Sequence, residues 1–366
     1  MYYIVTPVYN YNQPQVDFDN LFGVTPMPDP TLESFRPITK RYESLEDLPQ
    51  EALDLHIAKA NQFSIMFANY FITYQNTDMH QYYTSFRIPK RSGGTRRIEA
   101  PTDEIKVPMQ QMLRFLQSFL YADEAAYAYV KNRTVKDVHL AHKKTDHEWF
   151  LHLDLTDFFG RCTTRHIREA LKRIPLFDHL DVDTLDRFIH FITLDDKLPQ
   201  GTPLSPFITN LLMIEFDYNA RKEIRKHNGL YTRYADDMVI STTSRNATGH
   251  MKRIIQENLT STPHSIKEEK TRVSSIYGKN WNLGLMYNKD KNITVGYKNK
   301  EKMRAAINDF CTNQQAWTSQ QAMELLGKLQ YYISIEPEYF NSILQKYSTK
   351  HSTNVRQAII EKIKRG

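Results

Sequence analysis

Two short acidic clusters carry the side chains best suited to do chemistry. Asp154 closes the apolar run 149–153, and Asp236 and Asp237 lie together in Tyr234-Ala235-Asp236-Asp237. Adjacent carboxylates at a tight turn repel one another, and a divalent cation, which prefers oxygen ligands, would relieve that repulsion. Either cluster taken alone is equally consistent with an ordinary turn or strand end, because Asp is a common turn residue.

The two clusters together indicate phosphoryl transfer. A two-metal site needs carboxylates from separate chain segments that hold ions about 3.5–4 Å apart. Such ions activate an attacking hydroxyl, stabilise the transition state and neutralise a leaving pyrophosphate. We expect Asp154 and Asp236 to bridge the ions, with Asp237 in support.

Strand-like runs must position these carboxylates. Apolar and aromatic residues predict strands over residues 149–154, 231–234 and 238–242. Hairpins are expected at 85–99, around Gly93-Gly94, and at 283–295. Helical spacing is found over 45–74, 107–121, 165–173 and 185–192, and along one stripe formed by Ile208, Leu211, Leu212 and Phe216.

Composition narrows the possible functions. The 366 residues carry a net charge of +6 and include 22 Tyr and 19 Phe, which fits nucleic acid but is also common in other soluble proteins. No apolar run approaches the roughly 18–20 residues of a membrane span, and the N-terminus lacks a secretory pattern. Two cysteines, Cys162 and Cys311, are too few for a disulfide framework or a Cys-rich zinc site. We therefore expect a cytoplasmic protein without a membrane partner.

The order of the motifs resembles a bacterial reverse transcriptase. The matching segments are 88–96 for the fingers, 154–159 for motif A, 198–206 for motif B, 234–237 for motif C, 269–271 for motif D and 281–285 for the primer grip. The resemblance implies an α+β right-hand polymerase fold with fingers, an antiparallel-sheet palm and a helical thumb. It implies fingers over 46–148, a palm over 149–300 with a helical insertion at about 163–195, and a basic thumb over 301–366, while the prolines and aromatic residues of 1–45 predict an extended N-terminal arm.

The resemblance also implies roles for single residues. The catalytic and metal-binding set is Asp154, Asp236 and Asp237, with two Mg²⁺ ions that Mn²⁺ could replace, and Lys270 would protonate pyrophosphate. The residues expected to bind the deoxynucleotide are Lys90, Arg91, Arg96, Leu155, Phe159, Gln200 and Gly201. Phe159 would be the steric gate that excludes the ribose 2′-hydroxyl. The residues expected to contact primer or template are Tyr234, Trp281, Leu283 and Gly284.

Differences from the motifs of individual reverse transcriptase subfamilies narrow the expected type of enzyme. Residues 130–134 and His142 resemble the retron-specific region, but Val138-His139 replaces the Asn-Ala of retrons, and segment 281–285 replaces their Val-Thr-Gly. Ser205-Pro206 replaces the Ser-Gln of diversity-generating enzymes. These departures favour a compact enzyme of the anti-phage defence, or abortive-infection, type.

The expected activity is RNA-directed DNA synthesis. The expected partners are deoxynucleotides, the DNA product and an RNA template, including a dedicated non-coding RNA, and a homo-oligomer is left open. Two alternatives also stay open at this point. One is template-independent or protein-primed synthesis, which would start from a Tyr hydroxyl. The other is a catalytically silent, RNA-binding assembly subunit.

Overall fold

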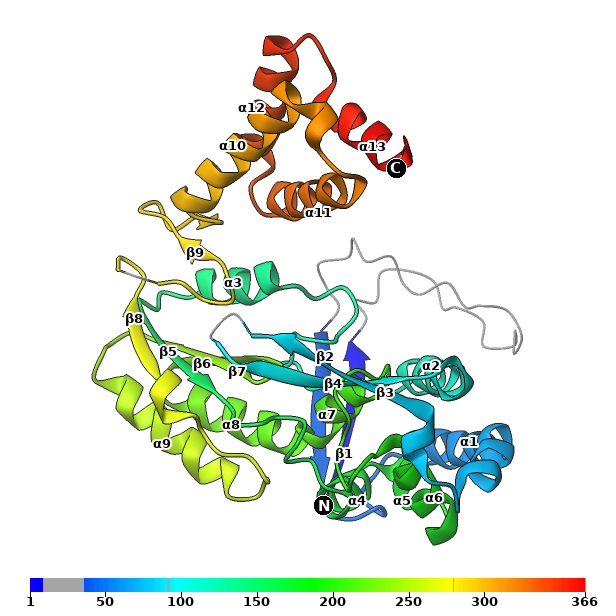
Figure 1. Ribbon diagram of the computed structural model, residues 1–366. Coiled ribbons are helices and arrows are strands. Elements are labelled where there is room, and N and C mark those ends of the chain that lie inside the picture. The colour runs from blue at the N-terminus through cyan, green and yellow to red at the C-terminus, as the bar shows by residue number, and fades with distance from the viewer. Residues whose placement is uncertain (9–35, 91–92, 279, 366) are drawn as a thin grey trace. The chain divides into compact units, whose positions relative to one another are not determined.

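The computed structural model describes residues 1–8, 36–90, 93–278 and 280–365. The chain divides into two compact units (Figure 1). Unit 1 comprises Met1–Thr134 and Leu151–Arg272, and unit 2 comprises Val135–Phe150 and Val273–Gly366. Within the described residues, no helix is both long and apolar enough to span a membrane.

A four-stranded sheet carries both acidic clusters. Its strands are β6 (Gly229–Tyr234), β7 (Asp237–Thr242), β5 (Trp149–Asp154) and β8 (Arg272–Ser275), in the order β6-β7-β5-β8. β6 and β7 form an antiparallel hairpin in which Tyr234 pairs with Asp237. The strands expected at 149–154, 231–234 and 238–242 are therefore present.

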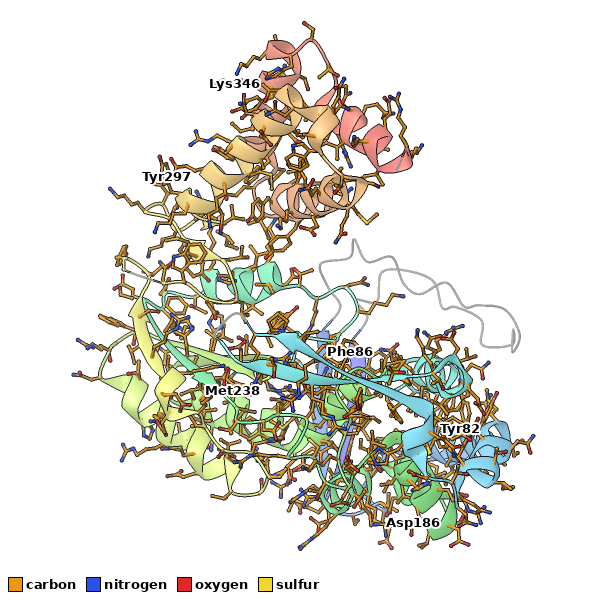
Figure 2. All side chains as sticks on the ribbon, viewed as in Figure 1. Tyr82, Phe86, Asp186, Met238, Tyr297 and Lys346 are labelled. Carbon is orange, nitrogen blue, oxygen red and sulfur yellow. The ribbon has the colours of Figure 1, made fainter. Side chains whose placement is uncertain are left out.

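Helices α8 (Ile214–Lys226) and α9 (Ala247–Leu259) cover one face of this sheet (Figure 1). Their apolar side chains share a core with Leu151 and Leu153 of β5 and with Met238 and Ile240 of β7; Met238 is labelled in Figure 2. Side chains alternate across a strand, so Asp154 and Asp237 must point to the opposite face. The period of two thus turns both carboxylates away from the core.

A second core of unit 1 is helical and rich in rings. It is built from α1 (Gln50–Tyr74), α2 (Asp103–Gln117), α4 (Thr164–Leu171), α5 (Pro175–Asp178), α6 (Val182–Ile192) and α7 (Ser205–Leu212). Phe63, Phe67 and Phe71 lie one turn apart on α1 and pack together, and the ring of Phe63 meets that of Phe188 edge-on at 5.3 Å. These rings account for part of the high aromatic content.

The stripe expected across Ile208 and Phe216 is divided between two helices, because α7 ends at Leu212 and α8 begins at Ile214. Ile208 and Leu211 belong to the helical core, whereas Phe216 belongs to the core beneath the sheet. The break at Met213 allows one continuous apolar pattern to serve two cores.

Two further strand pairs complete unit 1. β1 (Tyr2–Val8) pairs antiparallel with β2 (Arg36–Tyr42), so both ends of the Pro-rich arm are strands; its residues 9–35 lie outside the described residues. β3 (Tyr83–Pro89) pairs antiparallel with β4 (Thr95–Pro101) to form the expected hairpin, on which Figure 2 labels Phe86. A short 3-10 helix, η1 (Met79–Tyr82), precedes β3, and another, η2 (Glu268–Lys270), precedes β8.

Unit 2 combines a small hairpin with helices. Its elements are α3 (Val135–Lys143), β9 (Met286–Tyr287), β10 (Ile293–Thr294), α10 (Tyr297–Thr312), η3 (Gln314–Ala316), α11 (Ser319–Ile335), α12 (Pro337–Lys350) and α13 (Val355–Arg365). The Tyr287 hydroxyl donates a hydrogen bond to the His139 carbonyl oxygen at 2.8 Å, which joins the hairpin to α3. Tyr297 and Lys346, labelled in Figure 2, lie on α10 and α12.

A fully buried ion pair joins β6 to α8. The side chains of Arg233 and Asp217 are both 0% exposed, and Arg233 Nη2 lies 2.6 Å from Asp217 Oδ2. Arg233 also donates to the Ala235 carbonyl oxygen and to Asn210 Oδ1, each at 3.1 Å. A buried charge is tolerated only when it is paired and hydrogen-bonded, so this set must stay complete.

We predict that Asp217→Asn lowers the free energy of unfolding by about 3–5 kcal/mol, because it leaves the Arg233 charge buried without a counterion. Chemical denaturation would measure the loss. Glu223→Gln is the matched control on the same helix, since Glu223 pairs with Lys226 at the surface, and its effect should stay within about 0.5 kcal/mol. Equal effects of the two variants would contradict a structural role for the buried pair.

Candidate active site

The turn between β6 and β7 presents Asp236 and Asp237. Ala235, the first residue of this turn, has φ +58°, a left-handed conformation that is costly outside glycine. Arg233 Nη1 donates to the Ala235 carbonyl oxygen and thereby braces the turn from the core side. The strained turn is fixed by the buried pair below it.

Asp154 lies at the end of β5 and is joined to the same turn through the backbone. The Leu155 amide donates to the Asp236 carbonyl oxygen at 3.0 Å, and the Lys267 amide donates to the Asp154 carbonyl oxygen at 2.8 Å. Asp154 is 7% exposed, and the side chain of Leu155 is buried beneath the sheet. Two segments that lie about 80 residues apart in sequence are thus held together by a direct hydrogen bond.

The three carboxylates influence one another electrostatically. Burial, followed by the charges of Asp236 and Asp154, raises the pKa of Asp237 from 3.8 to about 7. The pKa of Asp236 is raised too, first by burial and also by Asp154, against the lowering effects of Lys270 and Arg96. The charge of Asp154 thus acts on both Asp236 and Asp237, and the three carboxylates share one electrostatic site.

Lys270, at the end of η2, is the cation of this site. Its ammonium donates to Asp154 Oδ2 at 2.6 Å. Burial lowers the pKa of Lys270, but the hydrogen bond and charge of Asp154, helped by Asp236 and Asp237, outweigh burial and raise it. In this structure Lys270 is the counter-charge of the carboxylates.

The donor set fits a hard divalent cation, because three carboxylates supply only oxygen ligands. Over the described ranges, however, no three His, Cys, Asp or Glu side chains are gathered as a ready-made metal-ligand group. The three carboxylates are therefore ligands of the type that such an ion prefers. In this structure the Asp154 carboxylate is paired with Lys270.

The residues expected to bind the nucleotide come from three segments of unit 1. Phe159, five residues after Asp154, is half-buried and meets the rings of Phe158 and Tyr129 edge-on. The Gln200 carbonyl oxygen accepts from the Glu99 amide at 2.7 Å. Gly201 has φ +128°, and a Cβ there would lie 2.7 Å from the Glu99 carbonyl oxygen, so the tight approach that requires glycine is to β4 itself.

The β3–β4 hairpin carries the expected phosphate-binding cations. Lys90 and Arg96 are both exposed, and Gly93 and Gly94 have positive φ at the tip. The charge of Arg96 lowers the pKa of Asp236, which shows that this guanidinium reaches the field of the carboxylates. Arg91 lies outside the described residues.

Of the residues expected to contact primer or template, Tyr234 ends β6, and the primer-grip residues Trp281, Leu283 and Gly284 lie in unit 2. Leu283 and Gly284 both have positive φ, as the centre of a tight hairpin turn requires, and Asn282 and Leu285 exchange backbone hydrogen bonds across it. Gly296 allows the Trp281 ring to pack against it, since a Cβ there would lie 2.6 Å from the indole.

Three residues near the carboxylates were not anticipated. Arg233 braces the β6–β7 turn, Arg272 lies within the field of Asp237, and Tyr129 touches Phe159. Of the three, only Arg233 could have been anticipated from the sequence. A charged residue in an otherwise apolar strand, next to two aspartates, indicates that it is buried with an ionic partner. The positions of Arg272 and Tyr129 depend on the fold.

Comparisons with known proteins point to one family. The family model for "Reverse transcriptase (RNA-dependent DNA polymerase)" matches residues 88–328. The retron Ec73 reverse transcriptase of Escherichia coli is 29% identical over 71% of this chain and 85% of its own length. The retron Ec83 enzyme of the same organism is 25% identical over 75% and 90%, and the retron Mx65 enzyme of Myxococcus xanthus is 25% identical over 80% and 70%. The similarity to retron enzymes runs against the expectation drawn from Val138-His139 and segment 281–285.

Among solved structures, telomerase from Candida tropicalis in complex with a fragment of telomeric RNA aligns with 82% of this chain and 63% of its own. The TM-score is 0.46 and the identity is 12%. The assignment to a family therefore depends on the sequence matches.

The raised pKa of Asp237 makes a prediction about stability without metal. Between about pH 4 and pH 7 the unfolded chain releases this proton while the folded protein keeps it, so this group destabilises the fold increasingly as the pH rises through that window. Asp237→Asn cannot ionise, and its melting temperature in chelator should exceed that of the wild type by more at about pH 7.5 than at about pH 5. A gain that is the same at both pH values would contradict the raised pKa.

Proposed function

This chain belongs to the reverse transcriptase family and is an RNA-directed DNA polymerase, and we propose that Asp154, Asp236 and Asp237 form its catalytic centre. The observation that carries the proposal is the Leu155–Asp236 hydrogen bond, which holds motif A against motif C. The charge of Asp154, which contributes to the raised pKa values of both Asp236 and Asp237, supports it.

Enzymes of this family use divalent metal ions, and we propose Mg²⁺, with Mn²⁺ as a substitute, held by these three carboxylates. When bound, such ions lower the pKa of the primer 3′-hydroxyl and neutralise developing phosphate charge. The 3′-oxygen attacks the α-phosphorus of the deoxynucleotide, and the bond from that phosphorus to the bridging oxygen of pyrophosphate breaks. The chain's own part is to hold the two segments in register while this exchange takes place.

Lys270 is proposed as the proton donor to the leaving pyrophosphate. Its ammonium is bonded to Asp154 here, so a metal ion on that carboxylate would compete with Lys270 and free it to turn toward the triphosphate. Lys90, Arg91 and Arg96 would grip the triphosphate, because guanidinium groups suit bidentate contacts with phosphate. Phe159 would exclude the ribose 2′-hydroxyl, and Leu155, Gln200 and Gly201 would complete the nucleotide site.

Tyr234, Trp281, Leu283 and Gly284 are proposed to contact the primer or the template. The template is RNA and the product DNA. We propose a dedicated non-coding RNA as the template. We propose a cytoplasmic role in bacterial anti-phage defence, and a homo-oligomer is compatible with it.

We predict that Asp236→Asn reduces deoxynucleotide incorporation at least about a hundredfold, because losing a ligand should cost more than losing a residue that only supports one. Primer extension on RNA would measure the rate, and circular dichroism would confirm folding. Glu269→Gln, an exposed neighbour of Lys270, is the control and should retain activity. A folded Asp236→Asn protein with full activity would overturn the site.

The template can be identified in the same system. Nucleic acid that copurifies from cells with wild-type protein should contain DNA complementary to one RNA, and the Asp236→Asn protein should retain the RNA without the DNA. DNA attached covalently to the protein would instead support priming from a tyrosine.

The role of Lys270 is tested separately. Lys270→Ala should lower the rate of incorporation by about 10²–10⁴-fold, the usual contribution of a general acid. Lys270→Arg keeps the charge beside Asp154, but a guanidinium does not release its proton, so this variant should stay slow. Wild-type rates for Lys270→Arg in rapid-quench measurements would show that only the charge matters.

A further inference from the structure

Tyr129 adopts a backbone conformation that is rare for an aromatic residue. Its φ is +61° within a turn, and its side chain is 46% exposed. A bulky residue with positive φ is strained, and such strain persists only where the surroundings impose it. Because strained residues cluster at functional sites, the position of Tyr129 calls for a functional explanation.

The backbone around Tyr129 is held from several sides. Buried Asn210 donates to the Ala128 carbonyl oxygen at 2.8 Å, and the Tyr127 amide donates to the Arg233 carbonyl oxygen at 2.8 Å. Arg133 Nη1 donates to the Ala126 carbonyl oxygen at 2.6 Å. This loop is therefore fixed to the same network that braces the catalytic turn.

The Tyr129 ring is in contact with the proposed steric gate. It meets the Phe159 ring edge-on, with centroids 6.5 Å apart and planes at 63°. Phe159 also meets the Phe158 ring edge-on, with ring centroids 5.5 Å apart and planes at 75°. Phe158 is itself buried, and its ring packs against His264 at 5.1 Å. Phe159 thus touches one ring fixed in the core and one, Tyr129, at the surface.

The Tyr129 hydroxyl is influenced by the charges of the proposed catalytic site. Burial and then the charges of Asp236 and Tyr234 raise the pKa of its hydroxyl, while Arg96 lowers it. The phenol therefore lies within the electrostatic field of the catalytic turn and of the proposed triphosphate clamp.

We propose that Tyr129 is a positioning residue that keeps the Phe159 ring where it excludes the ribose 2′-hydroxyl. This inference rests on the proposed gate function of Phe159. Phe159 also packs against both cores of unit 1, so without the Tyr129 ring it would lose the support on its surface side and could rotate toward the space that this ring fills, away from the sugar. The strained backbone then has a purpose, since it turns an aromatic side chain toward Phe159.

The test compares the kcat/KM of a deoxynucleotide with that of the ribonucleotide of the same base on one primer–template. Tyr129→Ala should raise the ribonucleotide-to-deoxynucleotide ratio roughly three- to tenfold, the factor that corresponds to one aromatic pair. Tyr129→Phe keeps the ring and should keep the wild-type ratio. Ile72→Ala, which removes an apolar side chain 54% exposed on α1, is the baseline control.

A double-mutant cycle separates positioning from a general structural effect. Phe159→Ala should raise the ratio more than Tyr129→Ala does, and adding Tyr129→Ala to Phe159→Ala should change it no further. A general effect on folding would lower both rates without moving the ratio. Melting temperatures would show whether each variant folds, and Tyr129→Leu, which keeps bulk without a ring, replaces Tyr129→Ala if that protein is unfolded.

The outcomes distinguish this inference from the function on which it rests. If Phe159→Ala raises the ratio and Tyr129→Ala does not, the positioning role is overturned and the gate stands. An independent effect of Tyr129→Ala in the Phe159→Ala background also overturns it. If Phe159→Ala leaves the ratio unchanged, the gate assignment fails and the positioning role fails with it.

Discussion

The buried pair of Arg233 and Asp217 is the interaction on which the proposed catalytic site depends. A guanidinium in the core must satisfy its donors, and Arg233 does so through Asp217 on α8, Asn210 on α7 and the Ala235 carbonyl oxygen in the β6–β7 turn. Each acceptor comes from a different element, so one side chain fixes two helices and a turn relative to one another. Replacing such a pair with apolar residues often stabilises a fold, but it would leave the strained turn unsupported.

The brace that Arg233 provides matters because the turn carries two carboxylates close to the negative charge of Asp154. Burial and neighbouring negative charge raise the pKa values of Asp236 and Asp237, with Asp154 acting on both and Asp236 acting on Asp237, a sign that ionised carboxylates are unfavourable there without a cation. Lys270 offsets part of this cost through Asp154. Catalytic sites commonly lower the free energy of unfolding in this way, and packing in the surrounding core must offset the loss. Here the compensation comes from the cores that fill unit 1 on the far side of the sheet and beside it.

The local pattern of the chain predicts much of this arrangement. The strand 149–154 and the hairpin around Ala235 could be read from apolar runs and turn residues, and the period of two places Asp154 opposite the core. What could not be predicted depends on distant partners. The burial of Arg233 requires Asp217, the position of Lys270 requires Asp154, and the approach that demands Gly201 is made to β4. The break at Met213 likewise follows from the existence of two cores, which no local window reveals.

The aromatic excess divides into two groups with different functions. Rings such as Phe63 and Phe67 are buried in the helical core and say nothing about nucleic acid. A smaller group continues from the buried pair toward the surface: the Arg233 guanidinium lies 5.9 Å from the Phe158 ring, Phe158 meets Phe159, and Phe159 meets Tyr129. The loop of Tyr129 returns to the Arg233 carbonyl oxygen through Tyr127. These contacts lead from Arg233 to Tyr129 and back to Arg233. The positions of the carboxylates and of the proposed sugar gate therefore both depend on Arg233. A substitution of Arg233 would therefore change both the rate of synthesis and the discrimination between deoxyribonucleotides and ribonucleotides.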